Sequence, residues 1–131
     1  MEYIKIIFEK DSFRFINNES LELFVIGHLL ISDVCYSSKK FINWTSDTTQ
    51  TVTDSNATYL EKKGNMIYIR DLFEEEGPCF GYKIPEFIQM LKEWNIVIKQ
   101  NPKEILITKD GDCKITIEGI GKLIDLVKES V

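Results

Sequence analysis

Residues 66–98, MIYIRDLFEEEGPCFGYKIPEFIQMLKEWNIVI, carry the clearest structural pattern in this chain. In their first part, Ile67 and Ile69 share one face of an extended segment, which predicts a strand over residues 66–73. A Gly-Pro pair then favours a turn, and residues 79–84 return to side chains that favour strands. The pattern therefore predicts two antiparallel strands joined by a wide loop.

An amphipathic helix is predicted directly after these strands, over about residues 85–99. Phe87, Leu91, Trp94 and Ile98 recur at helical spacing and form one apolar face. The proline that opens the segment suits the first helical position, where its missing N–H has no partner to lose. We expect this face to pack on the sheet, with Trp94 buried in the core.

The two ends of the chain also read as strands. Alternating apolar residues and turn-forming dipeptides predict strands at residues 3–9, 13–16, 104–108 and 114–118. The last of these is expected to stop at Gly119. A short C-terminal helix is then predicted from apolar residues at helical spacing, namely Ile120, Leu123, Ile124 and Val127.

The part between these ends is harder to interpret. Residues 21–36 are apolar nearly all round, so periodicity does not separate a buried strand from a buried helix. Length favours a helix, but the β-branched and aromatic residues lead us to favour a strand over residues 21–31. Residues 45–53 are rich in Thr, Ser and Asp and predict a loop or an edge strand. A short helix is predicted over residues 56–63.

Together these elements predict an α+β fold in a single domain, residues 1–131. It would consist mainly of antiparallel sheet, with the helix of residues 85–99 packed on it and a short C-terminal helix. The chain length is that of one domain. A hydrophobic content of 44% is typical of a globular protein with a core and argues against disorder.

The charge and hydropathy of the chain limit the classes of partner that it is expected to bind. The 21 acidic residues outnumber the 16 basic ones, which gives a net charge of −5. This balance argues against binding to a nucleic acid backbone, which requires a basic patch. The longest apolar run is too short to span a bilayer, and the N-terminus lacks a signal-peptide pattern. We therefore expect a cytoplasmic protein with no membrane partner.

The residues that most often carry chemistry are few and scattered. Cys35, Cys79 and Cys113 lie far apart and lack metal-binding spacing, so we expect free, reduced thiols. His28, the one histidine, lies in an apolar run and is expected to be structural, although a Cys–His nucleophile pair stays open because its members need only meet in space. We predict no enzyme, metal site or cofactor.

The one notable polar cluster is acidic. Asp71, Glu74, Glu75 and Glu76 lie within and beside the turn that joins the two predicted strands. Three adjacent carboxylates repel one another and should lie in solvent. The cluster is either an ordinary solvated turn or a negative patch that steers a basic partner. These four residues are the candidate partner-binding residues.

The order of residues from 82 to 117 resembles that of a known class of protein. The motifs are Tyr82-Lys83-Ile84-Pro85, Phe87, Leu91-Lys92, Trp94, Asn101-Pro102 and Ile105-x-Ile107. This layout is similar to that of small bacterial immunity proteins, which neutralise cognate polymorphic toxins, including those of contact-dependent growth inhibition systems. The resemblance implies a non-enzymatic cytoplasmic inhibitor that binds a toxin domain, often a basic nuclease, through an acidic surface. It carries over no catalytic residues. The alternatives are another protein-interaction module, or a small enzyme with an unrecognised pocket.

Overall fold

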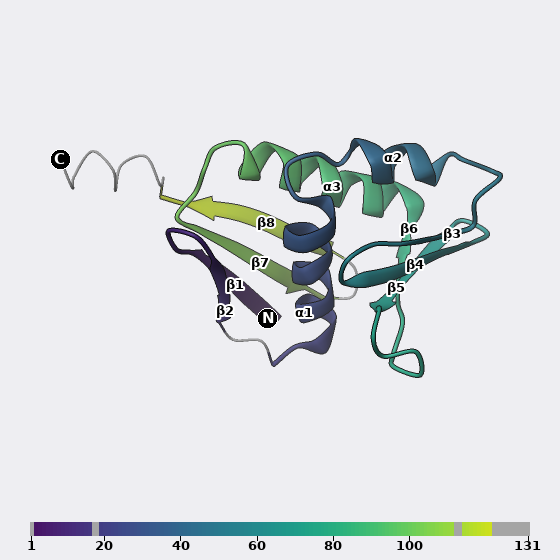
Figure 1. Cartoon of the computed structure of the whole chain (residues 1–131), viewed down its shortest axis with the longest axis horizontal. Coiled ribbons are helices and arrows are strands. Elements are labelled where there is room, and N and C mark those ends of the chain that lie inside the picture. The colour runs from purple at the N-terminus through teal and green to yellow at the C-terminus, as the bar shows by residue number, and fades with distance from the viewer. Residues whose placement is uncertain (1, 17–18, 112–113, 122–131) are drawn as a thin grey trace.

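The structure, a computed structural model, describes residues 2–16, 19–111 and 114–121. Over these residues the chain forms an α+β fold with two four-stranded antiparallel sheets (Figure 1). The strands are β1 (Glu2–Phe8), β2 (Phe13–Ile16), β3 (Val52–Asp54), β4 (Thr58–Lys63), β5 (Met66–Asp71), β6 (Phe80–Lys83), β7 (Glu104–Asp110) and β8 (Lys114–Ile120). The helical segments are α1 (Leu21–His28), the π-helical η1 (Leu29–Val34), α2 (Lys39–Thr45) and α3 (Ile84–Ile98). The predicted fold class is confirmed.

The first sheet joins the two ends of the chain in the order β2-β1-β7-β8. Its four strands were predicted, but β8 does not stop at Gly119 and runs on to Ile120. A Cβ atom at Gly119 would lie 3.1 Å from Cγ1 of Val97, so this glycine lets the end of α3 pack closely on the strand. Apart from Ile120, the residues of the predicted C-terminal helix lie outside the described residues.

The second sheet has the order β3-β4-β5-β6. The predicted pairing of β5 with β6 is confirmed, and Ile67 and Ile69 are fully buried. The predicted helix over residues 56–63 is wrong, because β4 occupies most of that segment and pairs with β5. Its buried residues alternate, with Thr58 and Leu60 inside, which is the period of a strand.

Residues 45–53 agree with the loop or edge-strand prediction, since β3 is the edge of the second sheet. The short helix α2 precedes this region and was not predicted.

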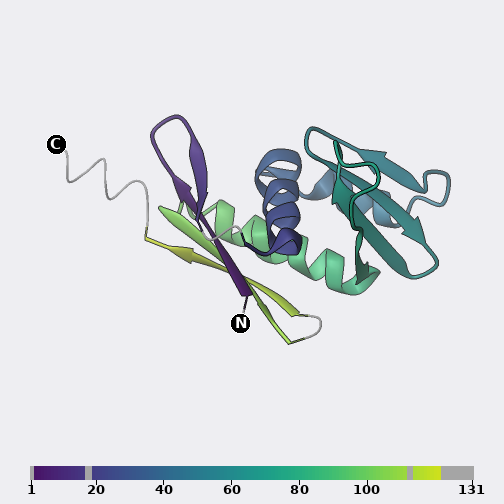
Figure 2. The ribbon, with the colours of Figure 1, turned by 90° about the horizontal axis from the view of Figure 1, so that it is seen from below.

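The strand predicted over residues 21–31 is wrong, because this segment is helical through α1 and η1. The Ser20 hydroxyl oxygen accepts a hydrogen bond from the Leu23 N–H at 3.3 Å and caps α1. The helix lies between the two sheets, as Figures 1 and 2 both show. It therefore meets apolar neighbours on several sides, and this is why its sequence lacks a one-sided pattern. A Cβ at Gly27 would lie 2.8 Å from the ring of Phe15. The absence of a side chain at Gly27 therefore lets Phe15 of β2 pack closely on α1.

One cluster of buried side chains joins the two sheets and the helices. Helix α3 contacts strands of both sheets and also packs against α2 and η1. Trp94 is the largest fully buried side chain, and its indole N–H donates to the Cys35 carbonyl oxygen at 2.7 Å. The predicted burial of Trp94 is confirmed, and the predicted helix matches α3 to within one residue at each end.

Candidate functional site

The four predicted carboxylates come together in the loop between β5 and β6, which we call the acidic loop (residues 71–78). The loop projects beyond the second sheet (Figure 1). Glu74, Glu75 and Glu76 are exposed, as expected, whereas Asp71 is half-buried. An Asp71 carboxylate oxygen accepts from the Phe73 N–H at 2.9 Å, and the Gly77 N–H donates to the Glu74 carbonyl oxygen at 2.8 Å. The loop is therefore built from hydrogen-bonded turns.

Contacts with other elements fix the base of this loop. The Leu72 N–H donates to the Ala57 carbonyl oxygen at 2.9 Å, which ties the loop to the β3–β4 turn. That turn is held by Asp33 of η1, whose carboxylate accepts from the N–H groups of Asn56, Ala57 and Thr58 at 2.8–3.0 Å. Hydrogen bonds to a carboxylate are stronger than those between neutral groups. The acidic loop is thus joined to η1 through the hydrogen bonds of the β3–β4 turn.

Phe73 is the residue in this loop that sequence reasoning missed. Its side chain is 80% exposed, more than any other large apolar side chain described. The sequence pattern assigned it to the end of a strand, but β5 ends at Asp71. Phe73 instead stands between Asp71 and Glu74 in the acidic loop. An exposed aromatic ring set among charges is a typical anchor for a protein partner.

A groove of about 350 Å³ lies beside the loop. Leu21, Phe24 and Val25 of α1 form its apolar side, and the acidic loop forms the other with Asp71, Glu74, Gly77 and Pro78. Leu21 is 48% exposed. Phe73 does not line this groove but is exposed in the same loop. An apolar wall beside carboxylates suits an amphipathic partner with basic residues around an apolar centre.

A polar network joins α1 to a strand of each sheet. The Tyr82 hydroxyl of β6 donates to Glu22 in the first turn of α1, and the ammonium of Lys109 in β7 lies 2.5 Å from the other Glu22 oxygen. Burial, together with the adjacent carboxylate, raises the pKa of Tyr82 far above its usual range. The phenol therefore stays protonated and acts as a hydrogen-bond donor that joins α1 to the second sheet.

His28 has a structural environment. Its ring lies 4.8 Å from that of Phe15 and 4.6 Å from that of Phe24. Burial lowers the pKa of His28, while the charges of Asp71 and Asp33 oppose this change. The neutral ring fits the apolar cluster between β2 and α1.

The thiols differ in their surroundings. The Cys35 thiol donates to the carbonyl oxygens of Ile31 and Ser32, both at 3.3 Å, and burial raises its pKa. A raised pKa disfavours the thiolate, the form that acts as a nucleophile. Cys79 is exposed, and both thiols are free. Cys113 lies outside the described residues.

Two properties of the described residues bear on metal binding and on membranes. Within residues 2–16, 19–111 and 114–121, no group of three or more His, Cys, Asp and Glu side chains is arranged to hold a metal ion. Over the same part of the chain, no single helix is long and apolar enough to cross a membrane. Leu21–Val34 and α2 meet the length and composition test only as a pair bent by 111°.

Comparisons with protein-family models, with curated proteins and with solved structures find no match to this chain.

Proposed function

We propose that this chain is a cytoplasmic immunity protein, without enzymatic activity, that binds and neutralises a basic toxin domain. The observation that carries the proposal is Phe73, an 80% exposed aromatic ring in a loop of carboxylates. The resemblance of residues 82–117 to immunity proteins of polymorphic toxin systems supports the same function. The net charge of −5 also suits a basic partner.

The acidic loop and the groove would contribute to different steps of binding, association and dissociation. Glu74, Glu75 and Glu76 are exposed and attract a basic surface over a distance, which raises the association rate. Phe73 and the apolar wall of the groove supply contacts that are desolvated in the complex and slow dissociation. Because the Leu72–Ala57 hydrogen bond ties the loop to the β3–β4 turn and hydrogen-bonded turns shape the loop itself, little order has to be gained on binding.

The proposal assigns no reaction to these carboxylates. Acid–base catalysis by a carboxylate pair requires environments that move the two pKa values apart. Glu74, Glu75 and Glu76 instead lie in one exposed loop and not in an apolar cleft. Neutralisation would instead follow from covering the toxin surface.

The experiment measures binding kinetics to the toxin whose gene lies beside that of this chain. The test variant replaces Glu74, Glu75 and Glu76 by Gln. We expect association to slow by roughly tenfold at low salt, because steering acts over the Debye length, and the difference from wild type to shrink as salt rises. A Phe73→Ala variant should instead raise the dissociation rate, by about 30-fold for an aromatic anchor.

A matched control removes three negative charges elsewhere. Asp11 in the β1–β2 turn, Asp54 in β3 and Glu118 in β8 are exposed. Asp11→Asn, Asp54→Asn and Glu118→Gln therefore change the net charge equally without touching the acidic loop. The control should associate nearly as fast as wild type. If it slows association as much as the loop variant does, net charge alone steers the partner and the loop is not the binding surface.

A further inference from the structure

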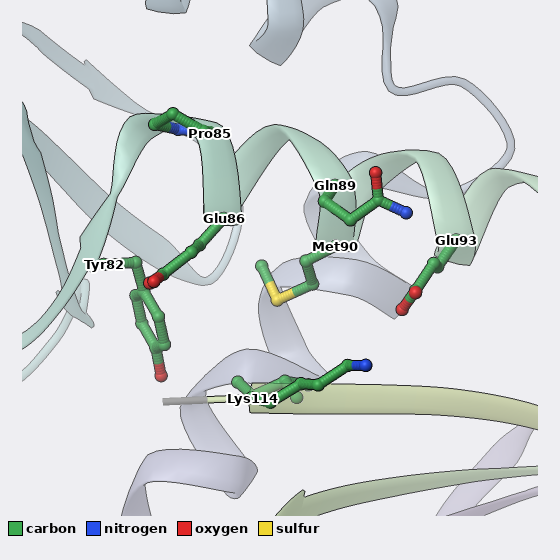
Figure 3. Close-up of a pocket in the computed structure, with 8 residues that line it drawn as sticks. Tyr82, Pro85, Glu86, Gln89, Met90, Glu93 and Lys114 are labelled. Carbon is green, nitrogen blue, oxygen red and sulfur yellow. The ribbon is translucent and has the colours of Figure 1, made fainter. Parts of the chain in front are cut away.

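A second pocket, of about 380 Å³, lies between the start of α3 and the first residues of β8 (Figure 3). It is lined by Tyr82, Pro85, Glu86, Gln89, Met90, Glu93, Lys114 and Ile115. None of these residues lines the groove beside the acidic loop. The volume is near the lower end of the range for ligand pockets, about 300–1,000 Å³, which suits one side chain better than a large cofactor.

The floor of this pocket is apolar. Met90 and Ile115 are buried side chains that present carbon and sulfur atoms to it. Tyr82 is also buried, and because its hydroxyl already donates to Glu22, the aromatic ring is what it offers to an occupant. Such a floor packs well against methylene groups and against the face of a planar cation.

The rim of the pocket is acidic on the side of α3. Glu86 and Glu93 are seven residues apart, two helical turns, and therefore lie on one face of the helix. Glu93 points from α3 toward β8, Glu86 points toward Tyr82, Met90 lies between them along the helix, and Lys114 lies opposite on β8 (Figure 3). Two carboxylates and one ammonium leave the rim with a net negative charge, which complements a cation.

The pocket and the groove lie on either side of the first turn of α1. Leu21 lines the groove, and its neighbour Glu22 accepts from the Tyr82 hydroxyl at the pocket. The Tyr82–Glu22 hydrogen bond therefore connects the wall of the pocket to the helix that lines the groove.

We propose that this pocket binds a single lysine or arginine side chain presented by the protein partner. The identity of that partner rests on the proposed function. The methylene stem lies over Met90, Ile115 and the ring of Tyr82, and the charged head lies between Glu86 and Glu93. The acidic loop gives the partner its first, long-range attraction, and this pocket gives one of its basic residues a fixed position.

A titration followed by amide NMR tests the pocket without the toxin. The probes are the peptide N-acetyl-Gly-Arg-Gly-amide and the same peptide with citrulline, a neutral side chain of nearly the same shape. We expect the arginine peptide to shift the amide signals of Tyr82, Met90 and Ile115 saturably, and the citrulline peptide to bind more weakly. Replacing both Glu86 and Glu93 by Gln should weaken arginine binding by about fivefold, the value of two ion pairs that solvent still screens.

A control pair, Asp54→Asn with Glu118→Gln, lowers the negative charge equally at exposed positions outside the pocket. It should leave the affinity for the arginine peptide unchanged. The proposal is overturned if citrulline binds as well as arginine, if the shifts centre on Phe73 instead of the pocket, or if neither peptide saturates. These results are independent of the toxin kinetics, so a failure of the pocket and a failure of the proposed function are separate outcomes.

Discussion

Trp94 offers the sharpest test of the packing that holds the fold together. Its side chain is fully buried on α3, and its indole N–H donates at 2.7 Å to the carbonyl oxygen of Cys35, the residue after η1. The side chain thus combines apolar packing with one buried hydrogen bond between two elements. Two substitutions separate these contributions: Trp94→Ala removes both, and Trp94→Phe keeps most of the ring but removes the donor.

The two substitutions should differ in size. Trp94→Ala is expected to cost about 3–5 kcal/mol, the value for a large aromatic side chain deleted from a core. Trp94→Phe should cost less, about 1–3 kcal/mol, because the Cys35 carbonyl oxygen loses its indole donor. Against a total stability of about 5–15 kcal/mol, the Ala variant is close to unfolding.

Urea unfolding followed by far-ultraviolet circular dichroism measures both effects. Dichroism is preferable to fluorescence because the chain has only two tryptophans, and each variant removes one. The midpoint should fall in the order wild type, Trp94→Phe, Trp94→Ala, with the slope unchanged. An unchanged midpoint in Trp94→Ala would refute the burial of the side chain. Equal midpoints for Trp94→Phe and wild type would refute a stabilising role for the hydrogen bond.

The remaining predictions concern three kinds of polar residue. Asp33→Ala should lower stability by about 2–3 kcal/mol, because three backbone N–H groups lose a carboxylate acceptor; unchanged hydrogen exchange of those amides would contradict this. Burial lowers the pKa of His28 in the folded chain below its usual value of 6.5. As the pH falls, the unfolded chain therefore takes up the proton before the folded chain does. The stability that the neutral ring contributes is fully present above the unfolded pKa and is lost as the pH falls through the folded pKa. His28→Phe should flatten the pH dependence of the urea midpoint below about pH 6.5, the unfolded value, and an unaltered dependence would count against it. Cys35, Cys79 and Cys113 should be reduced and dispensable, with the exposed Cys79 labelled by a thiol reagent before Cys35; a disulfide detected by mass spectrometry under both oxidising and reducing conditions would overturn this.

The elements that could be predicted are those with one apolar side. The strand β5 buries Ile67 and Ile69 on alternate positions, and α3 buries Phe87, Leu91 and Trp94 at helical spacing. In both elements the sequence period equals the period of the backbone, so the pattern identifies the structure.

The secondary-structure prediction was wrong for two segments, in which the apolar residues do not form one face or the polar residues suggest another element. Helix α1 lies between the two sheets, so its apolar residues do not form a single face and its β-branched residues suggested a strand. In β4, polar residues before the segment suggested a helix cap, whereas Gly64 at φ +60° belongs to the hairpin turn into β5. Here the pairing with β5, a tertiary contact, decides the conformation.

The candidate site was only partly predictable for a similar reason. The four carboxylates lie close together in the sequence, so a single loop necessarily contains them: Asp71, Glu74, Glu75 and Glu76. The groove beside them depends on α1, about 50 residues earlier, and only the fold brings these segments together. Phe73 continued the alternation of the strand, and no local signal marked the point where β5 ends.

The central claim is that this chain neutralises a basic toxin through the acidic loop. A growth assay tests it most directly: bacteria express the toxin encoded beside this chain, together with either the wild-type chain or a variant. The variant combines Phe73→Ala with Gln at Glu74, Glu75 and Glu76, and its folding is checked by its urea midpoint. The account predicts that wild type restores growth and that the variant, though folded, does not. Growth arrest in the presence of the wild-type chain, or full protection by the variant, would contradict it.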